Sequence, residues 1–164
     1  MDTTQILCTL RNVETFLGVY ASDLLPRTIT QPGTIIVNTD PHAERVPHWL
    51  AIDFQPKSYS SCYFDSYGLF PHIPSIHSLL KRTCSVWDFN TIQLQGLTIS
   101  VCGKYCCLFA LYVDRGFSQN SLSASLILSS PTDRSSRCSR PNSEHYVADL
   151  LEVNEAHVSI KVRT

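Results

Sequence analysis

The residues of this chain that could do chemistry together are a cysteine, a histidine and an aspartate: Cys102, His48 and Asp65. A cysteine thiol becomes a nucleophile when a histidine takes its proton, and a carboxylate can fix the tautomer of that histidine. Cys102 begins a predicted helix, where unpaired backbone N–H groups and the positive end of the helix dipole favour the thiolate. The set predicts peptide hydrolysis through a thioester on Cys102, with His48 as general base and Asp65 orienting it.

Two groups near the predicted nucleophile are suited to stabilise a developing oxyanion. The side-chain amide of Gln95 lies seven residues before Cys102, on the connection into the helix, and the second group is the backbone N–H of Cys102 itself. Gly103 leaves room beside the nucleophile for a substrate backbone. The alternative is that the three residues have structural roles only. Cys102 would then be a core cysteine, His48 a hydrogen-bonded histidine at a strand end, and Asp65 a carboxylate that caps a turn.

The hydrophobic pattern predicts the elements that position these residues. Residues 48–54 and 61–65 are expected to form an antiparallel hairpin, which places His48 at the start of one strand beside Asp65 at the end of the other. Asp53, the rival for the acid role, lies five residues after His48 and therefore on the opposite face of its strand. Asp65 is the better candidate.

The chain as a whole is predicted to adopt an α+β fold, with a mixed central β-sheet packed by helices. Residues 101–113 are apolar on nearly every side, which is typical of a helix buried in the core, and the nucleophile stands at its N-terminus. The other expected elements are a helix over 3–12 with threonines at its start as candidate N-caps, a turn and short extended piece over 16–26, a strand over 34–38, a helix over 76–82 with Ser75 as N-cap, and a strand over 91–94.

The composition changes after residue 117. Residues 118–143 are dense in serine and contain two prolines and three arginines, which is typical of a flexible segment. The chain is therefore divided into a folded domain over 1–117 and a serine-rich, partly disordered tail over 118–164. Within the tail, a short helix over 146–153 and a strand over 157–162 are expected.

Length and charge exclude several classes of protein. The 164 residues suffice for one domain with a hydrophobic core, and 13 Lys and Arg against 14 Asp and Glu give a net charge of −1. Such a chain has no overall basic field for nucleic acid or anionic membranes. It contains no apolar run as long as a membrane span, and its first residues are polar, unlike a secretory signal. We expect an intracellular monomer without a membrane partner.

The cysteines argue against a metal centre. The chain has seven of them, and Cys102, Cys106 and Cys107 lie within six residues without the spacing of zinc ligands. We therefore expect no structural zinc and no metal at the site. In a reducing compartment most of these thiols would be free, and a buried free cysteine behaves as a small hydrophobic residue.

Three motifs carry a resemblance to a known family: HW at His48 and Trp49, YFDSYG around Asp65, and QGLTISVCGKYCC from Gln95 to Cys107. In the order His, acidic residue, Gln, Cys, and in the spacing, the chain resembles the adenovirus proteinase (adenain) family, within a superfamily that includes the SUMO-deconjugating proteases. The resemblance implies the adenain-like fold and a cysteine endopeptidase. It also implies cleavage at Gly-containing sites in viral or virus-like capsid or core precursors, in the host nucleus or the virion.

The same resemblance bears on partners and cofactors. Cys84, eighteen residues before Cys102, stands where the adenovirus enzyme forms a disulfide with a small activating peptide; a buried free thiol is the alternative. DNA is an activity cofactor in the family, but the near-neutral charge argues against strong phosphate binding. Arg134, Arg137 and Arg140 are interpreted as part of a solvated tail. The sequence itself requires no cofactor.

Two rival functions stay open. Deconjugation of a ubiquitin-like modifier shares the His, Asp, Gln, Cys order, although the seven-residue spacing from Gln95 to Cys102 favours the adenovirus branch, because the deconjugating enzymes are one residue shorter there. The other rival is a catalytically degenerate, protease-like binding domain. Two departures from the family support it, namely Asp65 where the family often has Glu and the serine-rich tail in place of packed helices.

Overall fold

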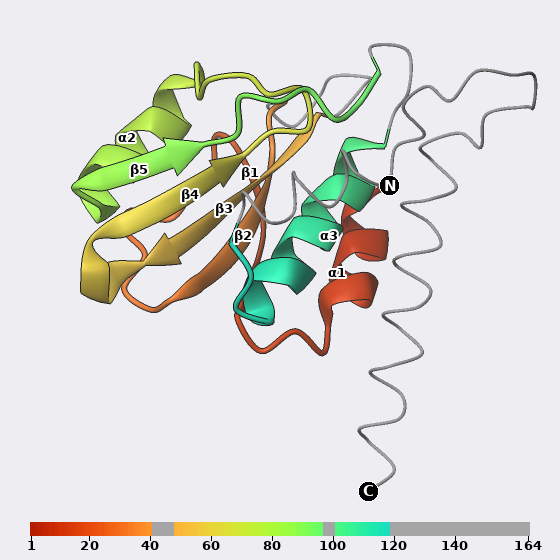
Figure 1. Ribbon diagram of the computed structural model, residues 1–164, viewed down its shortest axis with the longest axis horizontal. Coiled ribbons are helices and arrows are strands. Elements are labelled where there is room, and N and C mark those ends of the chain that lie inside the picture. The colour runs from red at the N-terminus through yellow and green to blue at the C-terminus, as the bar shows by residue number, and fades with distance from the viewer. Residues whose placement is uncertain (41–47, 97–100, 119–164) are drawn as a thin grey trace, which may run out of the picture.

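Five strands form one mixed sheet in the computed structural model, which describes residues 1–40, 48–96 and 101–118 (Figure 1). The described elements, in chain order, are α1 (Thr3–Leu10), β1 (Phe16–Ala21), β2 (Gly33–Asn38), β3 (Trp49–Gln55), the 3-10 turn η1 (Pro56–Ser58), β4 (Ser60–Phe64), α2 (Pro74–Thr83), β5 (Val86–Phe89) and α3 (Cys102–Asp114). The strands lie side by side in the order of the chain. β1 and β2 are parallel, β3 is antiparallel to both of its neighbours, and β4 and β5 are parallel.

Helices cover both faces of this sheet, with α1 and α3 on one face and α2 on the other (Figure 1). Side chains alternate along the strands to match: in β3, Trp49 and Ala51 pack with α1 and α3, whereas Leu50 and Ile52 pack with α2. Because both faces are buried, the central strands have continuous apolar runs. The α+β fold class, with a mixed central sheet between helices, is confirmed.

The two elements that matter most for the site are predicted correctly. β3 and β4 form the antiparallel hairpin, with Ala51 opposite Phe64 at the end where the site lies. α3 begins at Cys102 and lies in the core, as its apolar sequence predicts. Past its C-terminus, Gly116 has a φ of +80° and donates its N–H to the carbonyl of Val113.

The N-caps predicted for the first two helices, α1 and α2, are wrong. In α1 the cap is Asp2 rather than a threonine: its carboxylate accepts the N–H of Gln5 at 2.8 Å, and the Gln5 side chain accepts the N–H of Asp2 at 2.9 Å. In α2 the cap is Ile73 rather than Ser75, and it forms no side-chain cap hydrogen bond. Pro74 opens that helix, where a missing N–H costs nothing because the group would have no helical partner.

Two predictions about the strands are also wrong. Residues 91–94 form no strand; the strand in this region is β5, and residues 91–94 are irregular chain in which Leu94 donates its N–H to the carbonyl of Ser66 at 2.9 Å. Residues 16–26 contain a full six-residue strand, β1, rather than a turn and a short extended piece. Both strands pair in parallel with a neighbour reached through a crossover, which local sequence alternation does not reveal.

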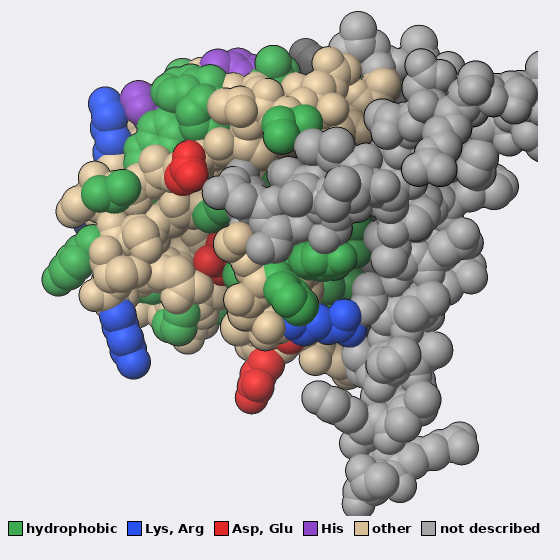
Figure 2. All heavy atoms as spheres, viewed as in Figure 1, with side chains coloured by type: hydrophobic (Ala, Val, Ile, Leu, Met, Phe, Trp, Pro, Cys, Tyr) green, Lys and Arg blue, Asp and Glu red, His purple; other side chains and the backbone are tan. Residues whose placement is uncertain are grey.

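On the face shown in Figure 2, the lysine and arginine side chains of the described residues lie apart from one another. Among the described helices, none has the length and apolar character needed to cross a membrane. The helix predicted over 146–153, the strand predicted over 157–162 and the three tail arginines lie outside the described residues.

Candidate active site

The hairpin brings the predicted base and acid together. His48 immediately precedes β3 and Asp65 immediately follows β4, so that the antiparallel pairing places both at the same end of the sheet. Nε2 of His48 lies 2.9 Å from Oδ1 of Asp65. Asp65 is 1% exposed, and its Oδ1 also accepts the backbone N–H of Tyr67 at 2.8 Å. A buried carboxylate with these two contacts holds the imidazole in one orientation.

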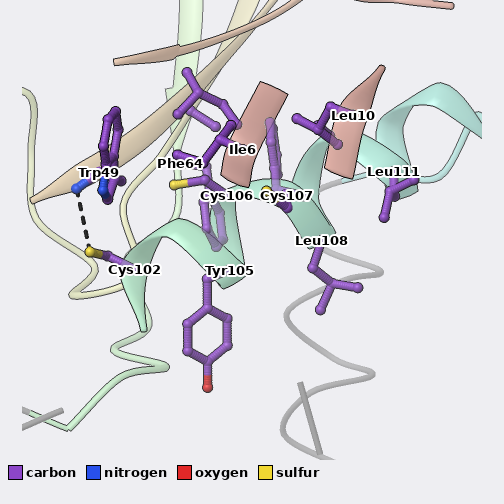
Figure 3. Packing of buried hydrophobic residues seen from close by; sticks show 14 of the residues in the cluster. Ile6, Leu10, Trp49, Phe64, Cys102, Tyr105, Cys106, Cys107, Leu108 and Leu111 are labelled. Atoms are coloured by element: carbon purple, nitrogen blue, oxygen red, sulfur yellow. Dashed lines mark hydrogen bonds between the residues drawn. The ribbon is translucent and has the colours of Figure 1, made fainter. Parts of the chain in front are cut away.

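The predicted nucleophile is the first residue of α3. Cys102 is 4% exposed, and its Sγ accepts the backbone N–H of Trp49 at 3.4 Å, drawn as the dashed line in Figure 3. The backbone N–H of Gly103 is a further donor to the sulfur. The thiol therefore lies among N–H groups of both the strand and the helix, which favour its ionised form.

His48 and Cys102 shift each other's titration. Burial by itself lowers the pKa of His48, but the hydrogen bond with Asp65, the contact with the Cys102 thiol and the charges of both raise that pKa to about 9. Burial raises the pKa of Cys102, but His48 and the N–H groups of Trp49 and Gly103 outweigh it, so the pKa of the thiol is lowered overall. The thiolate and the imidazolium are thus favoured together as a coupled pair.

The two nitrogens of the imidazole have different surroundings. Nε2 of His48 is engaged by Asp65, which leaves Nδ1 as the nitrogen that can exchange a proton with Cys102. Nδ1 is buried and has no closely aligned hydrogen bond with any described residue, although the ring and the thiol are near enough to shift each other's pKa.

Gln95 lies in a buried network beside the acid. It is 2% exposed; its Oε1 accepts the hydroxyl of Ser66 at 2.8 Å, and its Nε2 donates to the hydroxyl of Tyr67 at 2.9 Å. The ring of Tyr67 lies 4.9 Å from the ring of His48, measured between centroids. The structure therefore links the predicted oxyanion amide to the His48–Asp65 pair through Ser66 and Tyr67.

Three residues of this network are absent from the sequence-based prediction: Ser66, Tyr67 and Asn90. Asn90 is buried directly after β5; its Oδ1 accepts the N–H of Asp65 at 2.8 Å, and its Nδ2 donates to the carbonyl of Asp65. The adjacency of Ser66 and Tyr67 to Asp65 was a signal that could have found them. Asn90 had no such signal, because its role depends on the pairing of β5 with β4.

The expectation that Gly103 leaves room for a substrate backbone is wrong. A Cβ at Gly103 would lie 3.0 Å from Cβ of Met1 and 3.3 Å from Cδ1 of Trp49, so the missing side chain allows these residues to pack against α3. Trp49 is buried, and its Nε1 donates to the carbonyl of Met1 at 3.0 Å, so its indole packs within the fold.

Asp53 and Cys84 lie apart from this network. Asp53 accepts hydrogen bonds from Thr34 and Gln55, in agreement with the prediction that it points elsewhere. Cys84 is a buried free thiol whose Sγ donates to the carbonyl of Leu80 at 3.1 Å. The described residues hold no group of three or more histidine, cysteine or acidic side chains placed to bind a metal ion.

Residues 16–158 match the family model described as adenovirus endoprotease. The chain belongs to the adenovirus endoprotease family. The match to this family runs past residue 117 into the segment predicted as a tail, and the division of the chain at that point stays a prediction.

The chain is similar to the proteases of several adenoviruses. It is 32% identical to the protease of bovine adenovirus 4 over 136 residues, which cover 72% of this chain and 65% of that protein. It is also 32% identical to the protease of human adenovirus A serotype 12 over 88 residues, which cover 45% of this chain and 43% of that protein. In these two matches the chain spans 65% and 43% of the relative's length, less than two thirds in each case.

Two solved structures also resemble the chain. The ASFV pS273R protease superposes with a TM-score of 0.41 at 24% identity, over 53% of this chain and 34% of that one. The Chlamydia abortus effector protein ChlaDUB superposes with a TM-score of 0.42 at 14% identity, over 76% of this chain and 58% of that one.

Proposed function

We propose that this chain is a cysteine endopeptidase in which Cys102 is the nucleophile, His48 the general base and Asp65 the residue that orients the histidine. The observation that carries the proposal is the convergence of these three residues, from separate elements, at one end of the sheet, with the pKa of Cys102 lowered and the pKa of His48 raised. Membership of the adenovirus endoprotease family supports the same reaction.

The proposed reaction is peptide hydrolysis in two steps. The Cys102 thiolate attacks the scissile carbonyl carbon, and the His48 imidazolium gives its proton to the leaving amine as the C–N bond breaks. Water, deprotonated by His48, then hydrolyses the thioester and restores the thiol. The backbone N–H of Cys102 and the amide of Gln95 donate to the oxyanion, an effect worth roughly 3 to 4 kcal/mol for each good donor.

The substrates we propose are viral or virus-like capsid or core precursor proteins, cut at Gly-containing sites. The adenovirus proteases among the relatives support a viral context, and we place the activity in the host nucleus or the virion. A site for glycine suits a nucleophile that is almost wholly buried, because a residue without a side chain can approach the sulfur most closely.

Regulation by a peptide through Cys84 belongs to the same proposal, with the enzyme acting as a monomer. The Cys84 thiol lies against the Leu80 carbonyl, so forming a disulfide requires it to leave that contact. The net charge of −1 supports weak or no binding of DNA.

The test is turnover of a fluorogenic peptide whose acyl side ends in a Leu-x-Gly-Gly type sequence, measured with and without added DNA and candidate activating peptides. We expect Cys102→Ala and His48→Ala to abolish turnover. Cys8→Ala, which removes an exposed thiol, is the matched control and should retain it. Loss of peptide activation in Cys84→Ala would support the disulfide partner.

Three results would count against the proposal. Absence of turnover in the unaltered chain under all these conditions would indicate a degenerate protease-like domain. Turnover by Cys102→Ala equal to that of the unaltered chain would show that Cys102 is not the nucleophile. Hydrolysis of a diglycine-ended ubiquitin-like conjugate in preference to the fluorogenic peptide would indicate a deconjugating enzyme.

A further inference from the structure

One tight turn joins the predicted acid to the predicted oxyanion amide. Residues 65–68 form it, closed by the N–H of Gly68 donating to the carbonyl of Asp65 at 2.8 Å. Its first side chain contacts His48, and its next two contact Gln95. Four consecutive residues therefore supply Asp65 and contact Gln95, and the proposed reaction needs these two groups in fixed relative positions.

Ser66 holds both the backbone and the side chain of the segment that carries Gln95. Its carbonyl accepts the N–H groups of Leu94 and Gln95 at 2.9 and 3.0 Å, and its hydroxyl lies 2.8 Å from Oε1 of Gln95. Ser66 is fully buried, so water does not compete for these contacts.

Tyr67 holds the other end of the same amide. Its hydroxyl lies 2.9 Å from Nε2 of Gln95, its ring lies beside the ring of His48, and its backbone N–H donates to Asp65. Only the NH₂ edge of a glutamine amide donates hydrogen bonds, so an oxyanion gains from Gln95 only while the amide keeps the correct orientation. Two hydroxyl contacts on one buried amide restrict that orientation.

We propose that Ser66 and Tyr67 are positioning residues that hold the Gln95 amide for oxyanion stabilisation; this rests on the proposed function above. Neither hydroxyl needs to touch the substrate. The backbone and ring of Tyr67 serve the His48–Asp65 pair, and its hydroxyl serves Gln95, so removing the hydroxyl alone separates the two roles.

The kinetic test compares Tyr67→Phe and Ser66→Ala with and without Gln95→Ala. Each single change should lower kcat about fivefold to tenfold, with KM within about twofold, as expected for loss of one hydrogen bond in a positioning network. In the Gln95→Ala background neither change should lower kcat further, because the group it positions is gone. Tyr67→Phe should leave the pH profile unchanged, since the ring and backbone N–H remain.

Exposed residues provide the matched controls, Tyr59→Phe for the tyrosine and Ser85→Ala for the serine, and both should leave kcat unchanged. Losses in Ser66→Ala and Tyr67→Phe that persist undiminished in the Gln95→Ala background would overturn the proposal. So would kcat values equal to those of the unaltered chain.

A second measurement decides the question without turnover. The side-chain NH₂ signals of Gln95 in an NMR spectrum, assigned by their loss in Gln95→Ala, should shift and exchange faster with water in Tyr67→Phe and Ser66→Ala, but not in the controls. Unchanged signals would overturn the proposal. If the unaltered chain hydrolyses no peptide, the proposed function fails, while these signals still show whether the two hydroxyls hold the amide.

Discussion

The protonation of His48 is tied to the folded state, because burial, Asp65 and Cys102 together change the pKa of its ring. Its pKa rises from an ordinary 6.5 to about 9, so the protonated ring stabilises the fold fully below pH 6.5, and that contribution is lost as the pH rises through about 9. Cys102 has the opposite sign: its lowered pKa contributes stability above its ordinary value of 9.0, and this is lost as the pH falls through the lowered pKa. The thiolate of Cys102 and the imidazolium of His48 are therefore present together between the lowered pKa of Cys102 and the raised pKa of His48.

The first prediction is that Asp65→Asn shifts the pH dependence of activity. The alkaline limb of kcat/KM should lie near pH 9 in the unaltered chain and move to lower pH in the variant, because the carboxylate helps to hold the pKa of His48 up. At neutral pH the rate should fall by roughly a hundredfold or more, since a poorly oriented base loses most of its effect. The measurement is kcat/KM from pH 5 to 10.

Asp53→Asn is the control for this shift, because Asp53 is a buried aspartate of the same hairpin that does not contact His48. It should leave the alkaline limb in place. An unmoved limb in Asp65→Asn would mean that some other group sets the protonation of His48.

At the scale of elements, the position of the site depends on close packing between the 65–68 turn and the chain after β5. Asn90 binds the backbone of Asp65 on both sides, and Gly68 lets the turn approach residues 92 and 93. On the other side of the site, α3 is fixed by its apolar faces against β3 and α1 (Figure 3). Both packings hold residues that are far apart in the chain.

The second prediction concerns Gly68→Ala. Gly68 has a φ of +71°, and an added Cβ would lie 2.9 Å from the carbonyl carbon of Ile92 and 3.0 Å from the nitrogen of Gln93. The substitution should lower the free energy of unfolding by roughly 1 to 3 kcal/mol and reduce kcat, because backbone atoms must move next to Asp65. Urea denaturation and turnover measure the two effects.

Gly116→Ala separates backbone strain from crowding. Gly116 also has a positive φ, +80°, but an added Cβ would meet no atom within 4 Å. It should show only the left-handed penalty, roughly 1 to 2 kcal/mol, with normal kcat. Equal losses of stability and activity in both variants would show that the close approach of the turn to residues 92 and 93 is unimportant.

The third prediction tests how α3 packs against the sheet. Phe109 is fully buried, and its ring stacks on Phe64 of β4 at a centroid distance of 4.8 Å. Phe109→Ala should lower the free energy of unfolding by roughly 3 to 5 kcal/mol, through lost burial and the cavity that remains. Leu7→Ala, at a position of α1 that is 44% exposed, should change it far less, and a similar loss in both variants would contradict the packing of α3 described above.

At the scale of the whole molecule, burial and neighbouring charge separate Cys102 from four other cysteines of the described residues. Burial, followed by the charges of Asp53 and Asp88, raises the pKa of Cys62 to about 12; these two residues lie directly opposite it on β3 and β5. Burial likewise raises the pKa of Cys107 to about 12 and those of Cys84 and Cys106 above their ordinary value. Among these, Cys102 alone has its pKa lowered.

The fourth prediction is a rank order of thiol reactivity. With limiting iodoacetamide at pH 7, Cys102 should be alkylated about tenfold or more faster than Cys62, Cys84, Cys106 and Cys107, because the thiolate is the reacting species. Quantitative peptide mass spectrometry reads each site. His48→Ala should slow labelling of Cys102, and urea should make the reactivities similar. Equal labelling of Cys102 and Cys107 in the folded chain would refute the order.

Patterns within short stretches of sequence determined the hairpin, the buried helix and the His, Asp, Gln, Cys order. Alternation and apolar periodicity are local properties, so they report β3, β4 and α3 directly. They also place His48 and Asp65 at one end of a hairpin, because antiparallel pairing across a short turn leaves little choice of register.

Only the tertiary structure decided which distant groups meet. β1 pairs in parallel with β2, and β5 pairs in parallel with β4, each through a crossover connection. The hydrogen bond from Trp49 to Cys102 joins residues 53 positions apart. The Asn90 clamp on Asp65 and the hydroxyl contacts to Gln95 span 25 to 29 positions. Such contacts depend on how buried faces pack against one another, and a local pattern contains no record of the partner that packing selects.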